Sequence, residues 1–322
     1  MTTLRKRRFV LLLLLLTLAV FTLLNVVAYR HAHAMMHFST GGERTKRPEQ
    51  MTFLDKARLL VTGVNLPRPV TDLTPEALDP ACREIRITPP GGPGLSTWYV
   101  DRGESSPLVL MFHGYGAEKT CMLHEARQFL AMGASVLLAD FRGAGASEGN
   151  MTTIGALEAL DVASVTEHAR TGLRHRRVVL FGQSMGAAAI LKAVRDHGVR
   201  PDAVILESVF DRMTRTVGNR FRTMGLPAFP SAHLLVFWAG RQCGFDGFAH
   251  NPEDYVAGLT CPVLFLHGRH DPRATVADAR RVFAAAPEPK HFVEFPECAH
   301  GGFAAKDLPG WTAAVRPLVT RP

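Results

Sequence analysis

The chain has 322 residues, of which 47% are hydrophobic and 20% charged, and these proportions are those of a globular protein with a sizeable core. Its length allows one large domain or two medium ones. The net charge of +8 would suit a nucleic-acid-binding protein, but it is not spread evenly. Residues 1–50 hold eight basic and two acidic residues, which leaves the other 272 residues with a net charge of only +2. We therefore expect no nucleic-acid partner.

An apolar run near the N-terminus is long enough to cross a membrane. Residues 9–28 (FVLLLLLLTLAVFTLLNVVA) are uncharged, and as a helix these 20 residues would extend about 30 Å, the thickness of a bilayer core. Residues 5–8, all basic, precede the run directly, as in a signal peptide or a signal anchor. The run is longer than a usual secretory core, although Ala32-His33-Ala34 offers a cleavage site. We expect a retained single-pass anchor, and secretion after cleavage near Ala34 is the alternative.

The charges beside this run predict its orientation. Four basic residues precede it, whereas only Arg30 lies close on the other side, so we expect a cytoplasmic N-terminus and a periplasmic or extracytoplasmic remainder. Three parts follow from this interpretation. They are a basic cap with the anchor (residues 1–28), a polar juxtamembrane connection (29–80) and a folded domain (81–322).

Short apolar runs alternate with helical patterns in the folded domain. The β-type runs cover residues 83–88, 96–100, 107–113, 134–140, 176–182, 202–207, 261–268 and 290–296. The helical patterns cover residues 118–132, 152–171, 185–197, 274–286 and 310–319. Short apolar strands that alternate with helices are typical of a parallel sheet covered on both faces. The predicted fold class is α/β, with a mostly parallel central sheet flanked by helices.

The alternation stops for about fifty residues between Glu207 and Cys261. This stretch is aromatic, interrupted by proline and helical in pieces, and we place an insertion at about residues 211–255. Long irregular insertions in compact domains are often functional lids. An ordinary helical insertion that completes the core is an equally good interpretation.

Two serines stand in a G-x-S-x-G pattern, Ser147 in GASEG and Ser184 in GQSMG. A nucleophile elbow requires a strand that leads straight into the serine and a helix that starts just behind it. Ser184 follows the apolar run RRVVLFGQ and precedes the small-residue helix start MGAAAIL. Ser147 instead lies in a glycine-rich loop, and we interpret it as an N-terminal element of the next helix. The predicted nucleophile is Ser184.

The acid and the base of a triad should follow this serine in that order, each after a strand. His300 lies in a loop after the last strand, whereas His291 lies within that strand, so the predicted base is His300. Asp271 follows the penultimate strand and is the predicted acid, with Asp211 after the preceding strand as the alternative. A metal site at His267, His270 and Asp271 is a weak alternative because no second ligand cluster accompanies it.

Two backbone N–H groups are expected to stabilise an oxyanion. One belongs to Met185, the residue after the nucleophile, and the other to Tyr115 in the loop HGYG after the third strand. The glycines of this loop let the backbone approach an acyl oxygen closely. Strands commonly end in His-Gly, so this loop indicates an oxyanion hole only in combination with Ser184.

Taken together, HGYG, DFRGAGASEG, GQSMGAAA, LHGRHD and AHGGF occur in the order used by the α/β-hydrolase superfamily, which residues 83–320 resemble. The chain is most similar to serine-aminopeptidase-like and monoglyceride-lipase-like (S33-type) hydrolases, including membrane-anchored bacterial forms. In that family the DxRGxGxSxG stretch is a structural loop, which agrees with the rejection of Ser147. Residues 29–80 match no motif of the family.

The resemblance implies a serine hydrolase that needs no cofactor or metal. Ser184 would attack an acyl carbonyl, His300 would take and return the proton, and Asp271 would hold the imidazole tautomer. The expected substrates are small-molecule or lipid-like carboxylic esters, with thioesters and amides as further candidates. Two other classes stay open. One is a transacylase that uses the same triad, and the other is a non-catalytic hydrolase-fold module of an envelope assembly.

Overall fold

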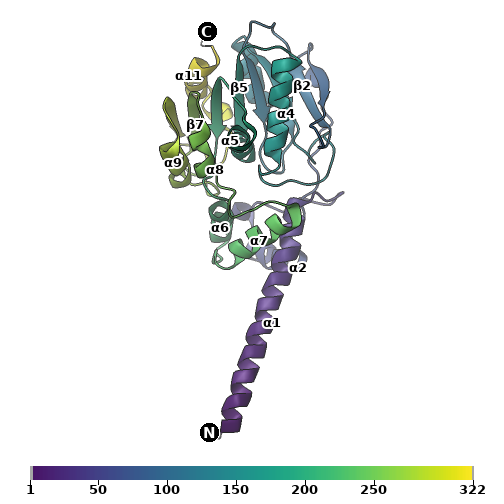
Figure 1. The fold of residues 1–322 in the computed structure, drawn as a ribbon, viewed down its shortest axis with the longest axis vertical. Coiled ribbons are helices and arrows are strands. Elements are labelled where there is room, and N and C mark those ends of the chain that lie inside the picture. Colours follow the sequence, from purple (N-terminus) through teal and green to yellow (C-terminus); the bar gives the residue numbers. More distant parts are fainter. Residues whose placement is uncertain (1–2, 321–322) are drawn as a thin grey trace.

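The computed structural model describes residues 3–320 and contains an eight-stranded sheet with the strand order β1-β2-β4-β3-β5-β6-β7-β8 (Figure 1). The strands are β1 (Arg83–Ile87), β2 (Leu95–Val100), β3 (Leu108–Phe112), β4 (Ser135–Ala139), β5 (Val178–Gln183), β6 (Ala203–Glu207), β7 (Val263–Gly268) and β8 (Lys290–Phe295). Strand β2 pairs antiparallel with β1 and β4, and every other neighbouring pair is parallel. The predicted α/β fold with a mostly parallel sheet is confirmed.

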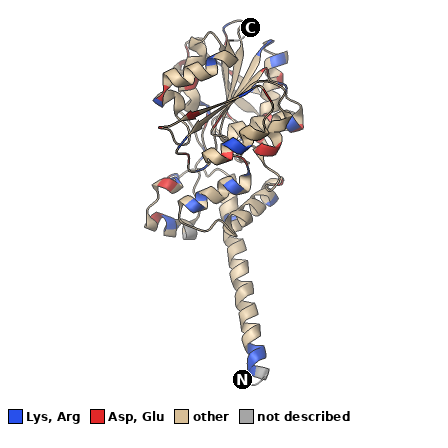
Figure 2. Cartoon of the chain, turned by 90° about the vertical axis from the view of Figure 1, so that its left-hand side faces the viewer, with Lys and Arg blue, Asp and Glu red and all other residues tan. Residues whose placement is uncertain are grey.

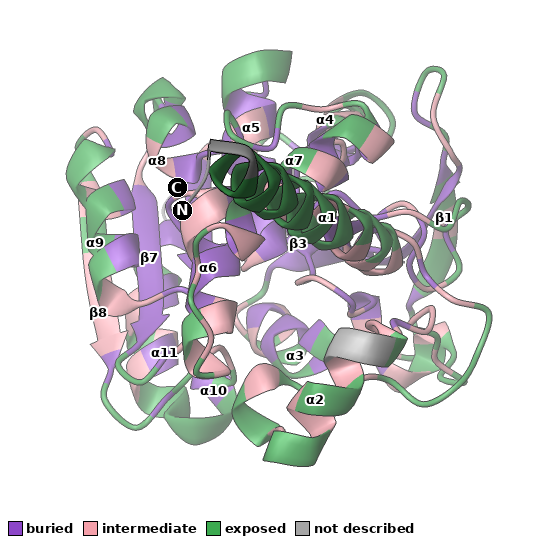
Figure 3. Ribbon diagram, turned by 90° about the horizontal axis from the view of Figure 1, so that it is seen from below, coloured by how far each residue is buried: buried purple, intermediate pink, exposed green. Residues whose placement is uncertain are grey.

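Helices cover both faces of the sheet. One face packs against α4 (Glu158–Thr171), α5 (Met185–His197) and α9 (Val276–Ala285), and the other against α3 (Leu123–Ala131), α10 (Phe303–Lys306) and α11 (Leu308–Val319). Leu108, Leu110 and Phe112 of β3 belong to the first core, whereas Val109 and Met111 belong to the second. Because both faces are covered, β3 and β4 are buried at every position and are apolar except at Ser135 (Figure 3).

The insertion between β6 and β7 forms three helices beside the carboxyl ends of the strands. They are α6 (Met213–Thr223), α7 (Ser231–Cys243) and the short α8 (Pro252–Tyr255). Apolar side chains of α6 and α7 form a third core cluster that also contains Ala188 of α5. The insertion therefore rests directly on the helix that follows Ser184.

A single long helix, α1 (Thr3–Met36), projects from the same end of the domain (Figure 1). It does not stop at Ala28, where the apolar run ends, but continues through Met36. Figure 2 shows basic residues at its N-terminal end and none along its middle. The span from Arg5 to Met36 is long and apolar enough to cross a membrane, and its most apolar stretch is fully exposed.

The last turns of α1 pack against α7. The Trp238 indole N–H donates to Asn25 Oδ1 at 3.1 Å, and Gln242 Nε2 donates to the Tyr29 carbonyl at 3.0 Å. Ala32 and Met36 are buried in the third core cluster together with side chains of α6 and α7. The end of α1 is therefore part of the folded domain.

The segment from residue 37 to residue 80 continues along the domain. It contains two short 3-10 helices, η1 (Pro48–Gln50) and η2 (Pro75–Ala77), and the helix α2 (Phe53–Thr62). Thr52 and Asp55 form a capping box at the start of α2. Arg68 donates to the Gly145 carbonyl at 3.1 Å and to the Gly149 carbonyl at 2.6 Å, which ties the segment to the loop after β4.

Candidate active site

Ser184 occupies a sharp turn between β5 and α5. Its backbone angles, φ 52° and ψ −104°, are unusual for a residue with a side chain. The flanking glycines are required by space, because a β-carbon on Gly186 would lie 2.2 Å from the Phe112 carbonyl oxygen and one on Gly182 2.6 Å from the backbone of Gly186. The Ser184 N–H donates to the Glu207 carbonyl of β6 at 2.8 Å. The turn is thus held by the neighbouring strands.

The side chains of Ser184, His300 and Asp271 form one hydrogen-bonded chain. His300 lies between β8 and α10, and Asp271 lies just after β7. His300 Nδ1 and Asp271 Oδ2 are 2.6 Å apart, and His300 Nε2 and Ser184 Oγ are 3.0 Å apart. With the ring proton on Nδ1 donated to Asp271, Nε2 is free to accept the proton of the Ser184 hydroxyl.

Asp271 is buried and oriented on both sides of its carboxyl group. Oδ1 accepts the N–H groups of Arg273 at 2.9 Å and Ala274 at 3.1 Å, and Oδ2 faces His300. Burial alone would raise the pKa of this carboxyl, but the hydrogen bond and charge of His300 together with the backbone donor lower it below its usual value. Asp271 is therefore held as a carboxylate.

The alternative acid lies in a different environment. Asp211 is fully buried and forms ion pairs with Arg215 and Arg281. These contacts join the insertion to α9, and no hydrogen bond between Asp211 and His300 occurs in the described residues. The structure thus brings Asp271, and not Asp211, to the histidine.

Ser147 makes none of its hydrogen bonds within the described residues to Ser184, His300 or Asp271, and instead stabilises the loop after β4. Its hydroxyl donates to the Asp140 carbonyl at 2.7 Å and accepts the Ser96 N–H at 2.9 Å. The prediction that Ser147 starts the next helix is wrong, because α4 begins only at Glu158. The Ser147 side chain is instead buried within the loop, where its hydroxyl forms hydrogen bonds with the backbone groups of Asp140 and Ser96.

The loop after β3 lies directly against Ser184. A β-carbon on Gly114 would lie 3.8 Å from that of Ser184. His113 Nδ1 is 2.9 Å from the Gly114 carbonyl, while its Nε2 accepts the Phe141 N–H at 3.1 Å. Because a trans peptide points its C=O and N–H in opposite directions, the Tyr115 N–H is turned away from His113. Met185 begins α5, where the first N–H groups have no partner within the helix.

One contact at this loop was not predicted from the sequence. The Tyr115 hydroxyl donates to the Met35 carbonyl at 2.6 Å, so the end of α1 touches the residue expected to supply an oxyanion donor. Thr152, whose N–H donates to the Met36 carbonyl, also contacts the Met185 sulfur at 3.3 Å. No motif in the sequence signals either contact, because both join segments that are distant along the chain.

The metal interpretation gains no support. His267 Nε2 is 2.8 Å from the Ala274 carbonyl, and Asp271 is engaged by His300. Within residues 3–320 there is no cluster of three or more His, Cys, Asp or Glu side chains that could hold a metal ion.

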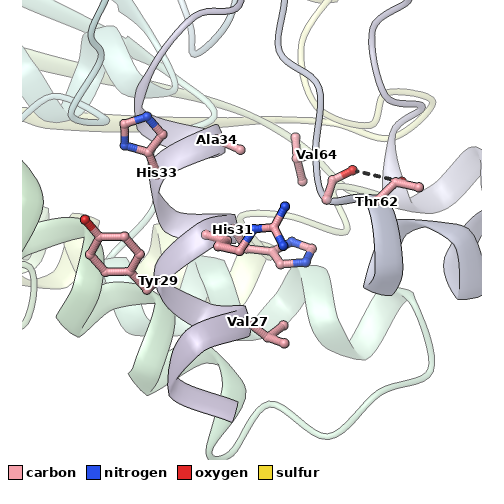
Figure 4. Close-up of a pocket in the computed structure, with 9 residues that line it drawn as sticks. Val27, Tyr29, His31, His33, Ala34, Thr62 and Val64 are labelled. Carbon is pink, nitrogen blue, oxygen red and sulfur yellow. Dashed lines mark hydrogen bonds between the residues drawn. The ribbon is translucent and has the colours of Figure 1, made fainter. Parts of the chain in front are cut away.

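A hollow of about 300 Å³ lies outside this site, between α1 and the end of α2 (Figure 4). It contains none of the predicted site residues. Its lining residues are Val27, Tyr29, Arg30, His31, His33, Ala34, Thr62, Gly63 and Val64. It marks the level at which the apolar part of α1 gives way to polar side chains.

Comparisons with known proteins agree with the fold and with a hydrolase. The model of the serine aminopeptidase (S33) family matches residues 103–235, which include Ser184 but end before Asp271 and His300. An uncharacterized protein of Mycobacterium tuberculosis is 28% identical over 245 residues, 75% of this chain and 80% of the relative. A lysophosphatidylserine lipase of Danio rerio is 26% identical over 213 residues, 62% of this chain and 53% of the lipase. An esterase of Pyrococcus furiosus has the same fold, with a TM-score of 0.68 and 23% identity over 80% of this chain and 97% of the esterase.

Proposed function

The chain is an α/β-hydrolase of the serine aminopeptidase (S33) type, and we propose that it cleaves carboxylic esters through an acyl-enzyme on Ser184. The observation that carries this proposal is the hydrogen-bonded chain from Ser184 through His300 to Asp271. These are the residue types that acyl transfer requires, and the separations are those of a working triad.

In the proposed reaction, His300 takes the proton of the Ser184 hydroxyl as its oxygen attacks the acyl carbonyl. The Asp271 carboxylate stabilises the resulting imidazolium and keeps the ring oriented. The N–H groups of Tyr115 and Met185 donate to the oxygen that becomes negative. His300 returns the proton to the leaving alcohol, and water then releases the acid by the same steps.

We also propose that α1 is a membrane anchor that is retained in the mature protein. Cleavage after Ala34 would remove the buried Ala32 and the turns of α1 that bind α7, so a retained helix fits the packing better than a cleaved signal peptide. From Ala28 to Met36 the helix rises about 12 Å, which places its buried end close above the headgroup layer when residues 9–28 span the core. The candidate site would then face the membrane surface.

Exposed apolar side chains on the neighbouring elements support this position. They are Phe53 and Leu54 at the start of α2, Phe237 on α7, and Phe229 and Phe248 beside α7. Both helices lie at the end of the domain from which α1 projects (Figure 1). Large exposed apolar side chains at one end of a domain are consistent with a membrane contact there. Lipid-like esters are therefore the favoured substrates, in line with the lipase among the relatives.

Labelling with a fluorophosphonate probe, which reacts with activated serines, tests the assignment. We expect Ser184→Ala to abolish labelling of the full chain and Ser147→Ala to leave it in any protein that folds. Ser105→Ala, a substitution at an exposed position, is the control and should be labelled like the wild type. Labelling that survives the change at Ser184 would refute the proposal, and hydrolysis of p-nitrophenyl esters of increasing chain length would define the acyl preference.

A further inference from the structure

Arg44 is held on the Tyr115 loop, and two further arginines from distant parts of the chain, Arg220 and Arg273, lie near enough to act on it or on Tyr115 by their charge. Arg44 follows α1, Arg220 belongs to α6, and Arg273 follows Asp271. Burial raises the pKa of the Tyr115 phenol, and the nearby charges of Arg220 and Arg44 oppose that rise. We call these three residues the arginine cluster.

Hydrogen bonds hold the cluster in place. Arg44 Nη1 donates to the Gly116 carbonyl at 2.6 Å, directly beside Tyr115. Arg220 Nη1 donates to Thr216 Oγ1 at 3.1 Å, and the same hydroxyl donates to the Arg273 carbonyl at 3.1 Å. The Arg44 guanidinium is thus fixed to the Tyr115 loop, and the Arg220 guanidinium is fixed to α6. Helix α6 also holds the backbone of Arg273 through Thr216.

The positive charge of the cluster is only partly neutralised. Glu49 forms an ion pair with Arg273, and the Asp271 carboxylate is engaged by His300. Burial lowers the pKa of Arg220, and the charge of Arg273 lowers it further, against the opposing effects of Tyr115, Asp271 and Glu49. Burial also lowers the pKa of Arg44, as do the charges of Arg47 and Arg273. The positive charges of Arg273 and Arg47 act against those of Arg220 and Arg44, and a bound anion would relieve that repulsion.

We propose that the arginine cluster binds a phosphate group on the substrate, next to the ester that Ser184 attacks. This inference rests on the proposed function and narrows its substrates to acyl esters with a phosphate-bearing alcohol. An ester whose carbonyl oxygen accepts the Tyr115 N–H would have its alcohol portion within reach of Arg44, which is held on the neighbouring Gly116. Guanidinium groups donate paired hydrogen bonds that match phosphate oxygens, and several of them surround a phosphate better than a single lysine does.

Two substrates with the same acyl chain test the proposal, oleoyl-lysophosphatidylglycerol with a phosphate and monooleoylglycerol without one. The full chain is assayed in a neutral detergent, and the ratio of kcat/KM for the two substrates is compared among variants. We expect Arg220→Gln to lower this ratio about ten- to hundredfold, the usual effect of losing a hydrogen bond between charged groups. Arg44→Gln should act in the same direction and keeps the test valid where Arg220→Gln fails to fold. Arg86→Gln on the edge strand β1 is the matched control.

Inorganic phosphate, added to the monooleoylglycerol assay, shows whether the arginine cluster binds free phosphate or only a phosphate group attached to a lipid. Inhibition that weakens in Arg44→Gln supports a site for phosphate itself, and a substrate preference without inhibition supports a site that needs the attached lipid. A ratio that is the same in the wild type, Arg220→Gln and Arg44→Gln overturns the inference while ester hydrolysis persists. A wild-type chain that hydrolyses neither lipid and resists the fluorophosphonate probe would overturn the proposed function itself.

Discussion

Asp271 and Asp211 are both buried carboxylates that follow strands, but they form ion pairs with different residues and therefore have different expected roles. Asp271 faces a histidine, whereas Asp211 faces two arginines. A carboxylate that orients a histidine acts on the reaction, and one paired with arginines between two helices acts on stability. Substitution of each aspartate by asparagine therefore distinguishes a role in the reaction from a role in stability.

We expect Asp271→Asn to lower kcat by about 10⁴-fold with little change in KM, because the imidazole takes the wrong tautomer. Asp211→Asn should lower the melting temperature and leave kcat of the folded protein near its wild-type value. Steady-state kinetics on a p-nitrophenyl ester, with melting curves beside them, would check both. The reverse ranking of the two kcat values would move the acid to Asp211.

Glu207 predicts a pH dependence of stability. Its carboxyl is fully buried, accepts the Trp311 indole N–H at 2.8 Å, and has a raised pKa, first because of burial and then because of Glu125. A group whose pKa is higher in the folded state stabilises the protein fully below its unfolded pKa of about 4.3 and loses that contribution as pH rises toward the folded pKa.

Glu207→Gln stays neutral and should lack this loss. Above pH 4.3 the free energy of unfolding of the wild type should fall by up to about 1.4 kcal/mol per pH unit relative to the variant. Melting temperatures of both proteins between pH 5 and pH 8 measure the difference. Parallel curves for the two would show that Glu207 is ionised in the folded protein.

At the scale of elements, the turn from β5 into α5 depends on close contact between backbones. Gly186 lies so near β3 that any side chain would collide with the Phe112 carbonyl. Such a contact cannot be relieved by moving a flexible side chain, because the colliding atom belongs to a central strand.

We therefore expect Gly186→Ala to destabilise the protein by several kcal/mol, about the upper range for single substitutions, or to abolish soluble expression. Gly258→Ala is the matched control, since its β-carbon would make only ordinary contacts with Arg195 at 3.6 Å. Thermal unfolding of both variants in detergent is the measurement. Equal stability of the two would mean that the turn is looser than its geometry indicates.

At the scale of the whole molecule, α1 joins a segment that is long and apolar enough to cross a membrane to the candidate active site. Its exposed apolar stretch precedes turns that pack against α7 and end at the Tyr115 hydroxyl. In the proposed anchored form, this helix would hold the candidate site at one height above a bilayer, which would suit substrates that reside in the membrane.

The charge bias around the anchor predicts that the C-terminus is extracytoplasmic. A periplasm-active reporter fused after Pro322 should therefore be active, and carbonate extraction should leave the chain in the membrane fraction. A reporter active only in the cytoplasm would contradict this orientation. A soluble product beginning at Met35 would instead show that the segment is a cleaved signal peptide.

The sequence alone determined the strands, most of the helices and the elbow of Ser184, because apolar periodicity and the glycines of a tight turn act over a few neighbouring residues. It also pointed to His300 and Asp271, since residues after parallel strands gather at one edge of the sheet. Only the tertiary structure brought Met35 to Tyr115 and assembled the arginine cluster. These contacts join segments that are 57 or more residues apart, and they depend on how α1, α6 and the segment after α1 pack together, for which no local pattern exists.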